Sequence, residues 1–154
     1  MKVELSVQEI QALHASFLTL LNGKLSITMW SKIFDILEVL EKELVSVQSK
    51  EKNLRETISK QYPDKEDKDL TKEEIEERNK QFQEGMQLIF EKRIELTIPE
   101  FLTIQEIKNI KGIDISGRDF LNLRSFCELL KYTKENEKVE EVVETEEQTD
   151  DTQN

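Results

Sequence analysis

Two kinds of spacing between apolar residues run along this chain and predict its secondary structure. Along four long stretches an apolar residue recurs every three or four positions, which is the spacing of a helix that buries one face. These stretches are 7–21, 27–60, 72–92 and about 117–131. Three short stretches instead place an acidic residue between two apolar ones: VEL at 3–5, IEL at 94–96 and IDI at 113–115. Such an alternation is typical of a strand with one buried and one exposed face.

The three short stretches are expected to form one small sheet, because a lone strand or a simple hairpin is only marginally stable in water. The apolar side chains of that sheet would face a helix, and Glu4, Glu95 and Asp114 would face water. The middle stretch runs into Pro99, which has no N–H to donate, so we expect its pairing to end at or just after Ile98.

Four predicted helix starts carry a hydroxyl residue that is followed three positions later by an acid. They are Ser6, Thr71, Thr103 and Ser116. In such a capping box the hydroxyl accepts from an early helical N–H, and the carboxylate reaches back to the cap. Between the first two helices, NGK at 22–24 predicts a turn in which Gly23 adopts the left-handed conformation.

The two longest stretches predict an antiparallel, coiled-coil-like helical hairpin, because their apolar residues advance by alternating threes and fours. This heptad seam runs through Trp30, Ile33, Leu37, Leu40, Leu44, Val47, Glu51, Leu54 and Ile58, and returns through Ile75, Asn79, Phe82, Met86 and Ile89. Glu51 interrupts the seam. Asn79 is either a buried amide that fixes the register or a residue at the hydrated edge of the hairpin, and the second interpretation is the simpler one.

The fold class predicted from these elements is α+β and mostly α: a head with a three-stranded sheet and capping helices, from which the hairpin projects. We expect a single domain over residues 1–132 and a disordered acidic tail over 133–154. The tail holds nine acids and two lysines, so it carries −7 of the net charge of −11. This balance disfavours direct binding to nucleic acid or to an anionic membrane.

No residue stands out as catalytic, cofactor-binding or metal-binding. The single histidine, His14, lies beside the apolar stripe of the first helix and is interpreted as a surface or boundary residue. The single cysteine, Cys127, lies on the apolar face of the last helix and is interpreted as a buried, inert thiol. A nucleophilic pair would need these two side chains to meet in space. We therefore expect no enzyme activity, and an enzyme of unrecognised type stays as an alternative.

The acidic stretch DKEDKD at 64–69 does not fit a calcium loop. An EF-hand loop needs Gly at its sixth position and Glu at its twelfth, and Asp69 and Ile75 stand there. The glutamates at 73, 74, 76 and 77 are interpreted as a solvated helix face. Trp30 and the phenylalanines sit at core spacing and are not interleaved with basic residues, as a platform for stacking bases would be. We expect neither a metal nor a cofactor.

The chain has one cysteine, no signal-peptide pattern at its start and no run of about 18 apolar residues. We therefore expect a soluble protein that is made and kept inside a cell.

Three segments span most of residues 1–123: MKVELSVQEIQALHASFLTLLNGKLS, WSKIFDILEVLEKELVSVQ, and QFQEGMQLIFEKRIELTIPEFLTIQEIKNIKGIDISGRDFLNL. Their layout of capped helices and a seam resembles small phage-encoded proteins of unknown function. The resemblance carries no site residue across, because none of the segments is a catalytic motif. It implies a phage context, in which small non-enzymatic chains serve as virion parts, assembly aids or modulators of host proteins. In that context the protein is expected in the cytoplasm of the host cell or in the virion.

The expected function is that of a non-enzymatic protein–protein interaction module, as a phage virion component or assembly factor. Its expected partners are phage structural proteins or another copy of the chain. An acidic inhibitor that mimics nucleic acid on a host protein is the alternative from another class.

Overall fold

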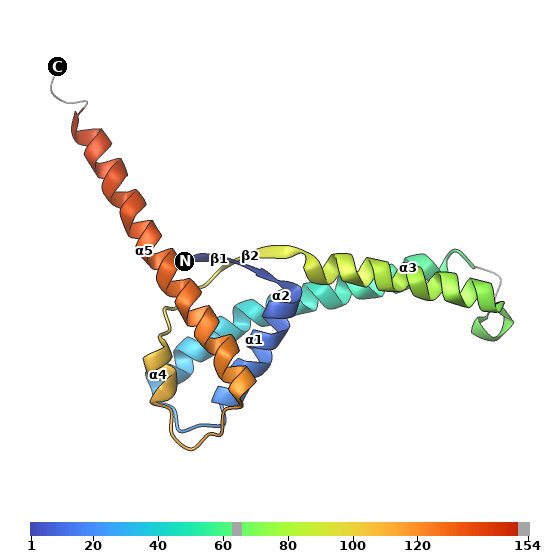
Figure 1. Ribbon diagram of the computed structural model, residues 1–154, viewed down its shortest axis with the longest axis horizontal. Coiled ribbons are helices and arrows are strands. Elements are labelled where there is room, and N and C mark those ends of the chain that lie inside the picture. Colours follow the sequence, from blue (N-terminus) through green and yellow to red (C-terminus); the bar gives the residue numbers. More distant parts are fainter. Residues whose placement is uncertain (63–65, 151–154) are drawn as a thin grey trace.

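The computed structural model describes residues 1–62 and 66–150, with side chains described for all of these except 67 and 137–150. Figure 1 shows a head from which two helical projections extend in different directions. The elements in chain order are β1 (Lys2–Ser6), α1 (Val7–Leu20), α2 (Ile27–Ser59), the short 3₁₀ turn η1 (Asp67–Asp69), α3 (Lys72–Glu91), β2 (Arg93–Thr97), α4 (Ile104–Lys108) and α5 (Gly117–Asp150). The prediction of a mostly helical fold with a small sheet is confirmed.

The sheet has two strands. β1 pairs antiparallel with β2, with Val3 opposite Leu96, which confirms the pairing expected between the first two alternating stretches. Both of these side chains are almost fully buried, at 3% and 2% exposure. The N–H of Ile98 donates to the carbonyl of Met1 at 2.9 Å, so the pairing extends to Ile98, as predicted.

Residues 113–115, the predicted third strand, do not join this sheet. They lie in the loop before α5, at the end of the head away from β1 and β2 (Figure 1). This loop turns at Gly112, with φ at 77°, and an isolated bridge joins Lys24 to Lys111. Both isoleucines of the stretch are half-buried against the head core. The prediction was wrong because their apolar side chains are covered by packing, without strand pairing.

The turn between α1 and α2 needs glycine for space rather than for a left-handed conformation. Gly112 has a positive φ, whereas Gly23 does not, so that prediction was wrong. A Cβ on Gly23 would lie 2.7 Å from Cγ2 of Ile113, and it would also meet Cγ2 of Ile110. The glycine therefore allows the loop after α1 to lie directly against the loop before α5.

Side-chain caps fix the helix starts largely as predicted. Ser6, Thr71 and Thr103 each form a complete capping box with the glutamate three positions on. The Ser116 hydroxyl accepts from the N–H of Asp119 at 3.1 Å, and it donates to the Asp119 carboxylate at 2.7 Å. This fourth cap is thus a hydroxyl–carboxylate pair, since Asp is one methylene shorter than Glu.

A buried polar bridge fastens α1 to α5. Ser16 is fully buried, and its hydroxyl lies 2.8 Å from a carboxylate oxygen of Asp119. The side-chain amide of Asn122 donates to the same hydroxyl at 3.3 Å. Beside this bridge the rings of Phe17 and Phe126 pack edge to face, with centroids 5.6 Å apart. The two helices are therefore joined by both apolar and polar contacts.

The head core lies where α1, the first half of α2, α4, α5 and the sheet meet. Its largest fully buried side chains are Ile10, Phe17, Leu20, Ile33, Ile36, Leu40, Ile98, Leu102, Ile107, Leu123, Phe126 and Leu130. Each contributes about 1.5–3 kcal/mol through burial, so this cluster supplies most of the stabilisation of the fold.

Beyond the head, α2 pairs with α3 to form a projecting arm, which we call the hairpin arm (Figure 1). α3 has no fully buried residue. The two helices approach closely at Gly85, where a Cβ would lie 2.6 Å from Cδ2 of Leu54. Arg55 lies 4.1 Å over the ring of Phe82 and bonds Glu51 at 2.9 Å. Glu51, which interrupts the seam, is therefore part of an ion pair at the rim of the arm.

α5 continues far beyond its predicted end near residue 131 and reaches Asp150. Lys134 still contacts the head, with its Nζ 4.2 Å over the ring of Phe101. Of the predicted acidic tail over 133–154, the part up to Asp150 continues α5, and residues 151–154 lie outside the described residues. Glu and Lys are good helix formers, which favours this extension although it has little to bury.

Among the helices of the described segments, none has the length and apolar character needed to cross a membrane.

Candidate functional site

An apolar patch is exposed on the first turns of α2 and the neighbouring end of α1. We call it the Trp30 patch; it comprises Leu18, Ile27, Trp30 and Phe34, with exposures of 43%, 88%, 49% and 47%. The rings of Trp30 and Phe34 stack on each other, with centroids 5.0 Å apart and planes inclined by 17°. The seam spacing predicted that Trp30 lies in the core, and that prediction was wrong. Adjacent exposed apolar side chains of this size mark interaction sites, whereas isolated ones are common on any surface.

The patch exists because α2 carries a wider apolar arc than the head covers. The buried side of its first turns is formed by Met29, Ile33, Ile36, Leu37 and Leu40. At about 100° per residue, Trp30 lies about 100° around the helix from Met29, and Phe34 about 40° further. A helix with apolar residues over so wide an arc buries them only if it is covered on more than one side. This width was the sequence signal that could have revealed the patch.

α1 borders the patch along one side. Nε2 of His14 lies 3.3 Å from a carboxylate oxygen of Glu41, which fixes where α1 and α2 meet. Leu18 lies one turn further along α1, and Phe34 lies two turns earlier along α2. Because the two helices run in opposite directions, both residues lie on the same side of this contact. His14, with 20% of its side chain exposed, is the boundary residue that the sequence predicted.

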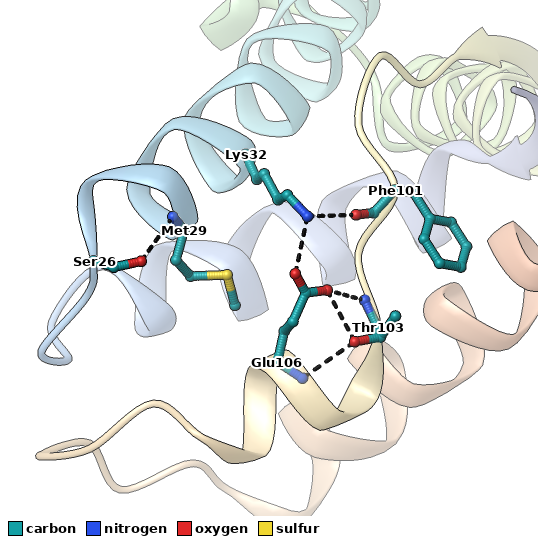
Figure 2. A network of polar contacts seen from close by, with 6 residues as sticks. All are labelled: Ser26, Met29, Lys32, Phe101, Thr103 and Glu106. Atoms are coloured by element: carbon teal, nitrogen blue, oxygen red, sulfur yellow. Dashed lines mark hydrogen bonds and ion pairs between the residues drawn. The ribbon is translucent and has the colours of Figure 1, made fainter.

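On the opposite flank of α2, a polar network ties the helix to α4 and the segment before it. Figure 2 shows the ammonium group of Lys32 donating to the carbonyl of Phe101 at 3.1 Å and to the Glu106 carboxylate at 2.9 Å. The other oxygen of that carboxylate accepts from the N–H and the hydroxyl of Thr103, at 2.8 and 2.9 Å. One carboxylate thus joins α2 to the capping box of α4.

This network is partly shielded from water, since the Lys32 and Glu106 side chains are 24% and 37% exposed. Burial by itself raises the pKa of Glu106, but hydrogen bonds from Lys32 and Thr103 and the lysine charge outweigh it, so the pKa is lowered. Nearby, the hydroxyl of Ser26 accepts from the N–H of Met29 at 3.1 Å and caps α2 (Figure 2). The first turns of α2 are therefore held at their start by the Ser26 cap and on one flank by the Lys32 network, so the Trp30 patch lies on a well-anchored part of the helix.

Cys127 is 5% exposed, which confirms that it is buried. Burial raises the pKa of its thiol to about 12, and the charges of Glu106 and Glu128 add to that rise. Because the thiolate is the reactive form, this cysteine stays protonated and unreactive near neutral pH.

The remaining residues that the sequence singled out lie mainly at the surface of the arm. Asn79 is exposed, which confirms the interpretation that places it at the hydrated edge. The glutamates at 73, 76 and 77 are exposed, and Glu74 is half-buried as part of its capping box. Of the stretch 64–69, residues 64 and 65 lie outside the described residues, and 67–69 form the short 3₁₀ turn. Over residues 1–62 and 66–150, no group of three or more His, Cys, Asp or Glu side chains is placed to hold a metal ion.

Comparison of the chain with protein-family models, with curated proteins and with solved structures gives no match. The assignment of function therefore rests on the surfaces described above. The Trp30 patch offers apolar area and aromatic faces, which are groups that bind rather than react.

Proposed function

We propose that this protein is a non-enzymatic protein–protein interaction module, and that the Trp30 patch is its binding surface. The observation that carries the proposal is the exposed, stacked pair of Trp30 and Phe34 on a firmly held helix. Trp is among the residues enriched at the energetic centres of protein interfaces. A large aromatic side chain buries about 150–250 Å², so covering the exposed halves of these two rings removes on the order of 200 Å² from water.

The charges beside the patch support a protein partner rather than a nucleic acid. Asp35, Glu38 and Glu41 lie along the same part of α2, and the whole chain carries a net charge of −11. Such a surface repels the phosphates that supply most of the affinity of nucleic-acid binding. The rings also stack on each other, so each already uses one face that a base would need.

The proposed setting is a phage particle or its assembly, in which the protein acts as a virion component or an assembly factor. This part rests on the resemblance of the three segments to small phage-encoded proteins. The hairpin arm supports an assembly role because it extends well beyond the head (Figure 1). We infer that α2 and α3 pack in a coiled-coil-like manner along it, as the alternation of threes and fours in both helices supports.

The test is affinity capture from the native cell with the full chain and with the double variant Trp30→Ala/Phe34→Ala, with captured proteins quantified by mass spectrometry. Loss of two such anchors is expected to weaken a partner by at least about 30-fold. Leu88→Ala is the matched control, because Leu88 is 73% exposed on α3, away from the patch. The proposal fails if the double variant, folded as judged by circular dichroism, retains every protein that the Leu88→Ala control retains.

An acidic inhibitor that mimics nucleic acid is a second candidate, favoured by the projection of α5. Eight of the nine acids of residues 133–154 fall within its helical part, which extends away from the head (Figure 1). Deleting 133–154 separates the two candidates. An electrostatic mimic loses most of its affinity and its salt dependence, whereas binding through the Trp30 patch is retained.

A further inference from the structure

The row of α2 side chains that forms most of the Trp30 patch continues into acidic residues. At about 100° per residue, Trp30, Phe34, Glu38 and Glu41 stay within about 80° of one another around the helix. Glu38 is exposed, and the Glu41 side chain is 60% exposed despite its contact with His14. One straight stripe therefore presents two aromatic rings and then two carboxylates.

The surroundings of this stripe are acidic as well. α1 and residues 27–45 of α2 together hold five acids and two lysines. Lys32, one of those lysines, is bound to Glu106 on the opposite flank of α2. Lys42, the other lysine, lies one turn from Glu38 along α2 and offsets only part of this charge. The stripe thus keeps a net negative charge at one end and an apolar surface at the other.

We propose that the Trp30 patch takes a basic amphipathic helix of a partner protein. Its apolar side chains cover Trp30 and Phe34, and its lysines or arginines lie over Glu38 and Glu41. This inference rests on the proposed function and adds the chemistry of the partner to it. The stripe from Trp30 to Glu41 spans 11 residues, or about 16 Å, which matches about three turns of a bound helix.

Two physical arguments select a helix with basic residues. α1 and α2 pack against each other, and the side-chain ridges on the exposed face of such a pair can interdigitate with the ridge of a third helix. Helices that bind in this way present their anchors at intervals of three, four and seven residues. Charges at the edge of such a contact contribute modestly to affinity but select the partner, because a like charge in the same place repels.

Trp30 is the only tryptophan of the chain, so its fluorescence reports on the patch directly. The probes are three synthetic Ala-based peptides of about 18 residues, long enough to form a helix. The first carries leucines at i, i+4 and i+7 with lysines on the adjacent flank. The second replaces those lysines with glutamates. The third keeps the lysines and replaces the leucines with alanines.

The basic leucine peptide is expected to shift Trp30 emission to shorter wavelength and to bind about tenfold more tightly than the acidic one. That difference is expected to shrink at about 0.5 M salt. The full-length variant Glu38→Lys/Glu41→Lys is expected to bind the acidic leucine peptide more tightly than the basic one. The control variant Glu76→Lys/Glu77→Lys, changed on the exposed face of α3, is expected to keep the original preference.

Equal binding of the acidic and basic leucine peptides would overturn the basic partner and leave the Trp30 patch as a docking surface. The basic partner would also be ruled out if the preference for the basic over the acidic leucine peptide were the same in Glu38→Lys, in the double variant and in the wild type. It would likewise be ruled out if neither leucine peptide changed the Trp30 emission. The capture experiment with Trp30→Ala/Phe34→Ala is independent of all these outcomes, so it shows whether the interaction module itself stands.

Discussion

Two adjacent residues of β2 lie on opposite faces of the sheet, and substituting each is expected to have very different effects. Leu96 is 2% exposed and belongs to the head core, whereas the side chain of Glu95 is 55% exposed and pairs with Lys2 at 2.9 Å. Leu96→Ala deletes buried methyl groups and leaves a cavity, which typically costs about 2–5 kcal/mol. At about 2–4 °C per kcal/mol for a chain of this size, the melting temperature is expected to fall by roughly 5–15 °C.

Leu96→Asp adds the cost of burying an unpaired charge, which is several kcal/mol more. The total is comparable to the entire stability of a typical domain, about 5–15 kcal/mol, so the head is expected to unfold. Glu95→Lys loses the exposed ion pair with Lys2 but places the new ammonium group opposite Glu4 on the same exposed face, so the head is expected to stay folded.

Thermal unfolding followed by circular dichroism and hydrogen exchange measures both effects. In the wild type and in Glu95→Lys, the amides of Val3, Leu96 and Ile98 are expected to exchange slowly. In Leu96→Asp, protection is expected to disappear from both strands and from α1. Equal damage from Leu96→Asp and Glu95→Lys, or fast exchange throughout 94–98 in the wild type, would refute the sheet as the base of the head.

Three further predictions concern the rest of the fold. Leu40→Asp places a charge at a fully buried position and is expected to cost at least about 4 kcal/mol in urea unfolding, whereas Val45→Asp, at a 60% exposed position, is expected to cost little. The lowered pKa of Glu106 means that its charge stabilises the fold at neutral pH and that this stabilisation is lost as pH falls from about 4.3 through the lowered value. Glu106→Gln is therefore expected to flatten the acid limb of unfolding free energy against pH, and an unchanged limb would contradict the assignment. Gly23→Ala is expected to lower stability by about 1–3 kcal/mol, because its Cβ would clash with Ile113; a higher melting temperature would show that the two loops are not in contact.

Local signals in the sequence predicted the helices well, because they depend on residues close together in the chain. A capping box needs only two side chains three positions apart, and the boxes of Ser6, Thr71 and Thr103 are all present. Strand pairing between residues about 90 positions apart was also predicted, since the alternating apolar residues at 3–5 and at 94–96 both have to be covered. Both signals were reliable because few backbone conformations place these side chains where they can cap a helix or be buried.

The features that failed depend on what the rest of the molecule covers. A spacing of threes and fours shows that Trp30 shares a face with Ile33, but it does not say how wide a face the head covers. Residues 113–115 have apolar side chains to bury, and a loop buries them as well as a strand does. The NGK turn predicts that glycine is needed at position 23 for its backbone conformation, whereas the close approach of Ile113 shows that it is needed for space. The Trp30 patch was therefore missed, because whether those apolar side chains are exposed depends on which other elements pack over them.

α2 belongs to both the head and the hairpin arm, and it runs as one helix from Ile27 to Ser59. At 1.5 Å per residue, Trp30 stands about 44 Å from Ser59, so the helix acts as a spacer of fixed length. Any protein anchored at the end of the arm is held at that distance from a protein bound near Trp30. Inserting seven residues into the arm part of α2 would lengthen the spacer by about 10 Å and nearly preserve the direction of its outer end, whereas two residues would rotate that end by about 200°.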